Sequence, residues 1–267
     1  MVDGQCQPRL LYKICQGLTR SGRKVRMIQQ VKSKAVWTAV FIFTFLVSLT
    51  CLAFLLLPGG RKITLKLIKW WARWTLKLAG VKHEVIGIEK IPEGRPVVYV
   101  ANHQSTLDIP VCMAVLPGRV RMMAKHTLFK IPVFGWVLHA EGFVPVNRND
   151  RKKARLSLGP AATRLKKGVS IFVFPAGTRS RTGEVGTFKT GGYRLAIEAG
   201  VPIVPLALVG AEDLLAAARS LIKKGKITLI VGEAIETEGL KLSDRTRLRD
   251  ETWQWISETK KIYSASP

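Results

Sequence analysis

The longest apolar run of the chain lies near its N-terminus and predicts a membrane-associated helix. Residues 35–57 are 23 consecutive positions without a charge, AVWTAVFIFTFLVSLTCLAFLLL. At about 1.5 Å per residue, such a helix extends roughly 35 Å, enough to cross a hydrocarbon core of about 30 Å. A buried core helix is the alternative. A signal peptide fits less well, because the run is too long and no small-residue cleavage site follows it.

A second helical pattern follows the stop at Pro58, Gly59 and Gly60. In residues 61–79 apolar side chains recur with a helical period, and lysines and arginines share the other flank. Tryptophans beside lysines are typical of a helix in the membrane interface, with packing on a partner helix as the alternative. Basic residues flank both ends of the apolar run, so a single crossing would leave one basic flank on the wrong side. We expect a helix pair that dips into the membrane or lies shallowly in it, although a true crossing stays open.

From residue 81 onward the pattern alternates between short apolar runs and helical periods, which predicts an α/β domain with a mostly parallel central sheet flanked by helices. Strands are expected at residues 83–88, 96–101, 119–124, 142–145, 170–174, 203–208 and 226–231. Helices are expected at residues 107–115, 151–167, 190–199, 211–223 and 243–263. The chain thus divides into a basic segment at 1–34, a membrane-anchoring helix pair at 35–80 and an α/β domain at 81–267.

Composition adds a strong positive charge to this picture. The 267 residues include 43 lysines and arginines against 18 acidic residues, a formal charge of +25. Such a surface attracts polyanions: nucleic acid, an acidic membrane face or a phosphorylated substrate. The four cysteines form no CxxC pair or His/Cys cluster. We therefore expect reduced thiols in a cytosol-facing protein, with neither a zinc site nor a disulfide framework.

One predicted strand ends on polar residues that can do chemistry. Asn102 and His103 follow the strand at 96–101, and Asp108 lies five positions after the histidine. In α/β sheets, ligands bind at the carboxyl ends of the strands. A histidine beside a carboxylate can serve as a general base, although Asp108 in a first helical turn can also be a capping residue. No G-x-S-x-G elbow is present, so the base must activate a hydroxyl that the substrate brings.

Arginines follow two other predicted strands. Arg148 closes the stretch EGFVPVNR, and Arg179 lies in the Pro/Gly turn FPAGTRSRTG. Guanidinium groups beside amides exposed at glycine are typical of phosphate binding, although a single arginine in a turn is usually only solvated.

Together these motifs resemble the glycerolipid acyltransferases, and within them the bacterial 1-acylglycerol-3-phosphate acyltransferases. The resemblance covers roughly residues 80–235 and rests on four ordered motifs: Asn102-His103-x4-Asp108, Gly142-Phe143 with Arg148, Phe174-Pro175-Ala176-Gly177-Thr178-Arg179, and Val201-Pro202-Ile203-Val204-Pro205.

This resemblance implies an acyl transfer that produces phosphatidic acid. His103 would deprotonate the hydroxyl of a lysophosphatidic acid, Asp108 would orient His103, and the acyl group would come from an acyl carrier protein or coenzyme A thioester. No metal or organic cofactor is implied. Arg148, Gly177, Thr178 and Arg179 would hold the acceptor phosphate. Asn102, Pro175, Ala176, Pro202 and Pro205 would support the motifs. Cys112 is expected to be a structural thiol rather than an acyl-enzyme nucleophile.

One position departs from the family pattern. The third motif usually has glutamate where this chain has Ala176, so we expect weaker acceptor binding or slower turnover if that carboxylate contributes.

Two alternatives to this function stay open. The chain could acylate another acceptor, such as glycerol 3-phosphate or a different lysophospholipid, or it could be a non-catalytic protein that binds membranes or nucleic acid. We expect no nucleic-acid partner, because no nucleic-acid module is present. The expected location is the inner or plasma membrane, with the active domain on the cytoplasmic side.

Overall fold

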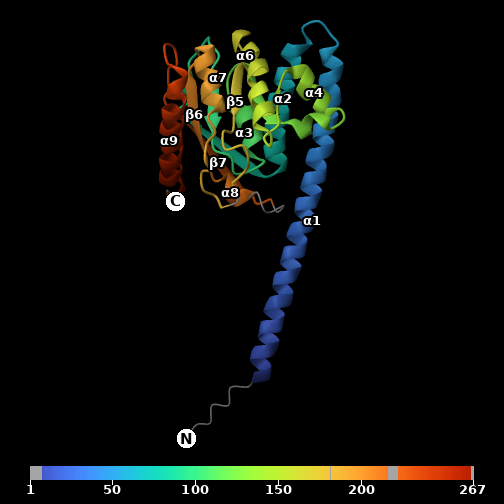
Figure 1. The fold of residues 1–267 in the computed structure, drawn as a ribbon. Helices are drawn as coiled ribbons and strands as arrows, with labels where there is room; N and C mark the ends of the chain where they lie inside the picture. Colours follow the sequence, from blue (N-terminus) through green and yellow to red (C-terminus); the bar gives the residue numbers. More distant parts are fainter. Residues whose placement is uncertain (1–7, 181, 216–221, 266–267) are drawn as a thin grey trace.

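The computed structural model describes residues 8–180, 182–215 and 222–265. An α/β domain lies beside a long N-terminal helix, α1, whose N-terminal half extends beyond the domain (Figure 1). Helix α1 (Pro8–Leu55, 48 residues) is continuous through the basic segment and the apolar segment, whereas the sequence predicted a helix only from residue 35. The reason is that no proline interrupts the chain between Pro8, which opens the helix, and Pro58, which follows it.

Helix α2 (Gly60–Leu78) packs against α1 after a tight turn. A Cβ atom at Gly60 would lie only 1.7 Å from the Phe54 carbonyl oxygen, so this turn requires glycine. Trp71 donates from its indole Nε1 to Thr44 Oγ1 at 2.9 Å, which fixes the two helices side by side. Within α1, the segment Met27–Leu55 is long and apolar enough to cross a membrane.

The domain is built on a seven-stranded sheet with the order β1-β7-β6-β2-β5-β3-β4. All neighbouring strands are parallel except β6 and β7. The five strands β2 to β6 therefore end at one edge of the sheet, which is where the predicted site residues follow. Each of the seven predicted strands is present: β1 (Val81–Ile86), β2 (Val98–Ala101), β3 (Val120–Lys125), β4 (Val144–Val146), β5 (Ser170–Val173), β6 (Ile203–Val209) and β7 (Gly225–Val231).

Helices cover both faces of the sheet. On one face α2 and α3 (Asp108–Val115) share an apolar cluster with the alternate strand residues Tyr99, Phe172 and Leu206. On the other face α6 (Leu158–Lys166), α7 (Gly191–Ala199) and α9 (Arg245–Ala265) pack on Val98, Ile171 and Ile203. The remaining elements are α4 (Phe134–Glu141), α5 (Arg151–Leu156), α8 (Ala211–Leu214) and the 3₁₀ turns η1 (Ile88–Lys90), η2 (His126–Lys130) and η3 (Leu242–Asp244).

Two predicted helices differ from the structure, and one short helix was not predicted. Residues 151–167 are two helices, α5 and α6, that meet at Ser157. The Ser157 hydroxyl donates to the Pro145 carbonyl at 2.7 Å, and Pro160 lies in the first turn of α6, where proline is tolerated. Helix α4 was not predicted, because it is short and apolar on most sides. Of the helix predicted at 211–223, α8 covers the start, and residues 216–221 lie outside the described part of the chain.

A buried ion pair joins the helix pair to the domain. Arg121 on β3 pairs with Glu141 at the end of α4, and both side chains are almost inaccessible to solvent. Glu141 also accepts a hydrogen bond from Thr64 on α2. Burial lowers the pKa of the Arg121 guanidinium, while the Glu141 carboxylate opposes that effect. The position of α2 on the domain therefore depends on a shared polar cluster as well as on apolar packing.

Candidate active site

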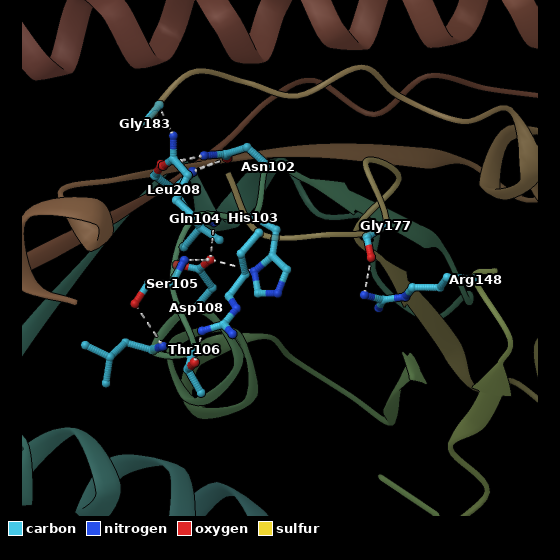
Figure 2. Close-up of polar contacts among 12 residues, drawn as sticks. Asn102, His103, Gln104, Ser105, Thr106, Asp108, Arg148, Gly177, Gly183 and Leu208 are labelled. Atoms are coloured by element: carbon cyan, nitrogen blue, oxygen red, sulfur yellow. Dashed lines mark hydrogen bonds and ion pairs between the residues drawn. The ribbon is translucent and has the colours of Figure 1, made fainter. Parts of the chain in front are cut away.

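The carboxyl end of β2 carries a histidine and a carboxylate in direct contact (Figure 2). His103 Nδ1 lies 2.7 Å from Asp108 Oδ2; His103 is 9% exposed and Asp108 is fully buried. The same carboxylate oxygen accepts the backbone N–H groups of Gln104 at 2.8 Å and Ser105 at 2.9 Å. The ring is held through Nδ1, so Nε2 is the nitrogen that can accept a proton from a substrate.

Asp108 thus has more than a capping role. It begins α3, but its carboxylate accepts the His103 ring in addition to two amides of the preceding loop. Three donors converge on one carboxylate oxygen, which holds the carboxylate in place and, through it, the orientation and tautomer of the imidazole.

Asn102 anchors this loop to the neighbouring strand. Its side chain donates to the Leu208 carbonyl at 2.8 Å and accepts from the Leu208 N–H at 2.8 Å, which continues the β2–β6 pairing through a side chain. Gln104 accepts from Asn102 Nδ2 at 3.1 Å and donates to the Gly183 carbonyl (Figure 2). The loop that carries His103 is therefore held on both sides.

The third motif packs directly on the histidine. The Phe174 ring, at the end of β5, stacks on the His103 ring with centroids 3.9 Å apart and planes tilted by 14°. Ser180 N–H donates to the His103 carbonyl at 2.9 Å, and Arg179 Nη1 donates to Thr106 Oγ1 at 2.6 Å. The turn after β5 and the loop after β2 therefore form one unit around the histidine.

The two arginines that the sequence assigned to the acceptor phosphate have different partners in the structure. Arg148 donates to the Gly177 carbonyl, whereas Arg179 donates to Thr106; Figure 2 shows Gly177 and Thr106 on different sides of the His103 ring. Gly177 has φ of +79°, a conformation that favours glycine. Burial lowers the pKa of Arg148, and a partly desolvated cation of this kind gains more from an anionic ligand than a solvated one.

The other motif residues surround this turn. Thr178 is exposed, Pro175 is buried, and Ala176 is half-buried. A Cβ atom at Gly186 would lie 3.3 Å from the Ala176 Cβ, so the backbone of the following loop passes close to the position where the family has glutamate. Pro202 accepts the Val98 N–H at 2.9 Å, and Pro205 on β6 lies beside Val100 on β2; both prolines are buried supports.

The cysteine near the site lacks the properties of a nucleophile. Cys112 lies one turn beyond Asp108 on α3 and is fully buried. Burial, with a smaller contribution from the Asp108 charge, raises the pKa of this thiol well above its ordinary value. A thiol of this kind stays protonated and agrees with a structural residue.

Two pockets lie on opposite faces of the sheet, each lined by residues that neighbour the dyad rather than by His103 or Asp108. An open apolar pocket of about 540 Å³ lies among α1, α2, α3 and α4, and Ile109 and Met113 of the Asp108 helix line it. A second pocket of about 570 Å³ reaches from Phe174 and Arg148 to Ala154 and Leu158.

Several functional candidates were missed from the sequence. The sequence marks Phe174 and Gln104 only by their place beside the motifs. Their roles, stacking on His103 and hydrogen bonding to Asn102 and Gly183, depend on how the loops pack in the fold. Lys189 was also missed, although a Cβ at Gly177 would lie 3.5 Å from its Nζ, beside Arg148 Cδ at 3.9 Å. In the described part of the chain, no group of three or more His, Cys, Asp or Glu residues could hold a metal ion.

Comparison with known proteins agrees with this geometry. A family model described as Acyltransferase matches residues 82–209. The chain is 32% identical to 1-acyl-sn-glycerol-3-phosphate acyltransferase beta from Homo sapiens, covering 79% of this chain and 75% of that protein. It is also 32% identical to the 1-acyl-sn-glycerol-3-phosphate acyltransferase of Pseudomonas aeruginosa, over 71% of this chain and 74% of that one. It spans only 45% and 55% of two chloroplast relatives, from Brassica napus and Arabidopsis thaliana.

A solved structure has the same fold. The crystal structure of the 1-acyl-sn-glycerophosphate (LPA) acyltransferase PlsC from Thermotoga maritima matches with a TM-score of 0.79 and 27% identity, over 92% of this chain and 99% of that one. The similarity in sequence and in fold extends over most of this chain and most of the human and Thermotoga maritima proteins. The protein belongs to the acyltransferase family that contains the 1-acyl-sn-glycerol-3-phosphate acyltransferases.

Proposed function

We propose that this protein transfers a fatty acyl group from a thioester to the sn-2 hydroxyl of 1-acylglycerol 3-phosphate and releases phosphatidic acid. The observation that carries the proposal is the 2.7 Å contact between His103 Nδ1 and Asp108 Oδ2 at the carboxyl end of β2. The names of the relatives, which are 1-acyl-sn-glycerol-3-phosphate acyltransferases, support the same acceptor.

In this reaction His103 is the general base. Its Nε2 takes the proton of the acceptor hydroxyl as that oxygen attacks the thioester carbon, and Asp108 stabilises the imidazolium that forms. When the C–S bond breaks, the sulfur leaves as a thiolate and recovers the proton from the imidazolium. A thiol with a pKa of about 8.5 is a good leaving group, so the step needs no separate acid. We infer a direct transfer that requires neither a metal nor an organic cofactor.

Arg148 and the Gly177-Thr178-Arg179 turn bind the acceptor phosphate in this proposal. Arg148 lies against the Gly177 carbonyl, and Arg179 lies beside Thr106 in the loop that carries the base. A phosphate bound between them is held at a fixed place relative to His103. A phosphate in that position places the sn-2 hydroxyl of the acceptor at His103, and this placement needs no contact with the acceptor's acyl chain.

We further propose that α1 and α2 attach the domain to the cytoplasmic face of a membrane. Large apolar side chains are exposed along this helix pair, including Phe41, Phe45, Trp70 and Trp74. Lys77 lies over the Trp74 ring at 4.3 Å, an arrangement typical of a membrane interface. The substrate and product are amphiphiles, so a site beside the bilayer exchanges both without releasing them to water.

The test is an acceptor panel with one labelled acyl thioester and the full-length protein in detergent. The acceptors are 1-acylglycerol 3-phosphate, glycerol 3-phosphate, a lysophospholipid with a choline head group, and monoacylglycerol. The proposal predicts labelled phosphatidic acid and at least about tenfold lower kcat/KM for the other three, because phosphate and apolar chain are both needed. Preference for any other acceptor contradicts the proposed substrate.

A further inference from the structure

Two cations converge on the glycine of the third motif. A Cβ atom added to Gly177 would lie 3.5 Å from Lys189 Nζ and 3.9 Å from Arg148 Cδ, so both side chains come close to one point beside this turn. Arg148 also donates to the Gly177 carbonyl. Lys189 belongs to none of the four motifs and has no role in the reaction proposed above. Two positive charges this close repel each other, and an anion bound beside them relieves that repulsion.

The space around these cations is a pocket without a negative charge. The pocket of about 570 Å³ at the edge of the sheet is lined by Arg148, Gly177 and Lys189, together with apolar residues and two further glycines. Among the residues that the structure describes, its lining includes no acidic side chain. A concave surface whose charges are all positive attracts anions.

The first turn of α7 opens into the same pocket. Gly191 and Gly192 line it, and a Cβ atom added to Gly191 would have no neighbour within 4 Å. The cap residue Thr190 makes no side-chain hydrogen bond to the helix. The N–H groups of a first helical turn have no partner inside their helix and carry partial positive charge. The helix end therefore adds to the attraction that the two cations exert on an anion.

The backbone of Lys189 is held in place on both sides. Its N–H donates to the Pro175 carbonyl at 3.0 Å, which ties it to the third motif. The preceding Phe188 is buried in the core, and α7 begins two residues after Lys189. The side chain itself is exposed, so its ammonium group can adjust to a ligand while its origin stays fixed.

We propose that Lys189 is a specificity residue of the acceptor site, which pairs with the second negative charge of a phosphate monoester. This inference rests on the proposed acyl transfer and adds Lys189 to Arg148 and Arg179. A phosphate monoester carries a charge of about −1.5 to −2 at pH 7, whereas a phosphodiester carries a single negative charge. The Coulomb energy is proportional to the charge of the ligand, so an additional lysine favours the monoester.

This location agrees with the orientation of the base. Figure 2 shows Gly177 and Arg148 on the opposite side of the His103 ring from Asp108. Because Nδ1 faces Asp108, Nε2 faces away from that carboxylate. Phe174 lines the pocket and stacks on the ring, with centroids 3.9 Å apart. A phosphate beside Gly177 therefore lies on the side from which the acceptor hydroxyl reaches Nε2.

The experiment measures binding without catalysis. The ligands are dodecyl phosphate and dodecyl methyl phosphate, which share one chain, lack a hydroxyl group to acylate and differ in charge. Both are titrated against the full-length protein in one nonionic detergent at about pH 8, where the monoester carries nearly two charges. The variants are Lys189→Met and Lys189→Arg. The matched control is Lys167→Met, which removes an exposed lysine at the end of α6, outside the pocket.

We expect Lys189→Met to weaken binding of dodecyl phosphate about tenfold and of dodecyl methyl phosphate about threefold, because halving the ligand charge halves the Coulomb energy. Lys189→Arg and the control should keep both affinities within about twofold. In the transfer assay, Lys189→Met should raise KM for 1-acylglycerol 3-phosphate about tenfold with kcat within about twofold. Equal losses for the two ligands, an unchanged affinity for the monoester, or the same losses in the control overturn the proposal.

The two proposals fail separately. If the protein acylates no 1-acylglycerol 3-phosphate but binds dodecyl phosphate through Lys189, the role of Lys189 stands and the proposed reaction is wrong. If transfer occurs and Lys189→Met binds both ligands as the unsubstituted chain does, the reaction stands and the role of Lys189 is wrong.

Discussion

Asn102 and Leu208 are joined by two hydrogen bonds of 2.8 Å each, across 106 positions of the chain. The side chain of Asn102 takes the place of a backbone in the β2–β6 ladder just where β2 ends. This contact fixes the start of the loop that carries the His103 base, so it links the stability of the sheet to the geometry of the site.

The first prediction concerns this contact. Asn102→Ala leaves the buried N–H and C=O of Leu208 unpaired, which should lower the free energy of unfolding by about 2–4 kcal/mol. Thermal or denaturant unfolding in detergent measures the effect. Asn147→Ala removes an amide whose one hydrogen bond is local and exposed, and serves as control. Equal effects of the two substitutions would contradict the anchoring role.

The second prediction concerns the partner of the base. Asp108→Asn keeps the shape but replaces an acceptor of three hydrogen bonds by an amide, so the tautomer and charge of His103 are no longer supported. We expect kcat to fall on the order of 10³-fold with a much smaller change in acceptor KM. Asp150→Asn, at the exposed cap of α5, is the matched control. A loss below about tenfold would mean that Asp108 is mainly a cap.

The third prediction concerns the buried ion pair between β3 and α4. Arg121→Met leaves Glu141 buried without its cation and should cost about 3–5 kcal/mol of stability. Lys226→Met breaks an exposed pair with Glu84 and should cost less than about 1 kcal/mol. Unfolding midpoints of the two variants in the same detergent give the comparison. If the Arg121 variant is no less stable than the Lys226 variant, the cluster does not hold α2 on the domain.

The fourth prediction concerns the departure from the family pattern at Ala176. A glutamate there would extend from a half-buried position beside the Gly186 backbone, next to the phosphate-binding turn. We expect Ala176→Glu to raise kcat/KM for 1-acylglycerol 3-phosphate by about threefold to tenfold, with Ala176→Gln as the neutral control. No gain over the unsubstituted chain, or the same gain with glutamine, would show that the carboxylate has no role here.

The sequence predicts the strands of this fold better than it predicts the site. Short continuous apolar runs between turn residues, such as residues 203–208, are typical of buried parallel strands, and all seven strands were found. The division between α5 and α6 was missed because the helical period continues across Ser157, and only Pro160 marks the break. The motif residues His103 and Asp108 were correctly expected to meet, since only four residues separate them across one turn.

Contacts between residues that are far apart in the sequence could not be predicted from local sequence patterns. Nothing local indicates that Phe174 stacks on His103, or that Arg148 contacts Gly177 while Arg179 contacts Thr106. The family resemblance assigns both arginines to the acceptor phosphate but says nothing of the protein groups that hold each one. Their actual partners, Gly177 and Thr106, depend on how the loops after β2, β4 and β5 pack together.

The most direct test of the account is single-turnover transfer of a labelled acyl group to 1-acylglycerol 3-phosphate by the full-length protein and by His103→Ala. His103→Ala removes the base while leaving Asp108 its two backbone donors, so the loop should keep its shape. We predict labelled phosphatidic acid with the unsubstituted chain and a rate at least about 10³-fold lower with the variant. Transfer at a similar rate in both proteins would contradict the assignment of His103 as the base.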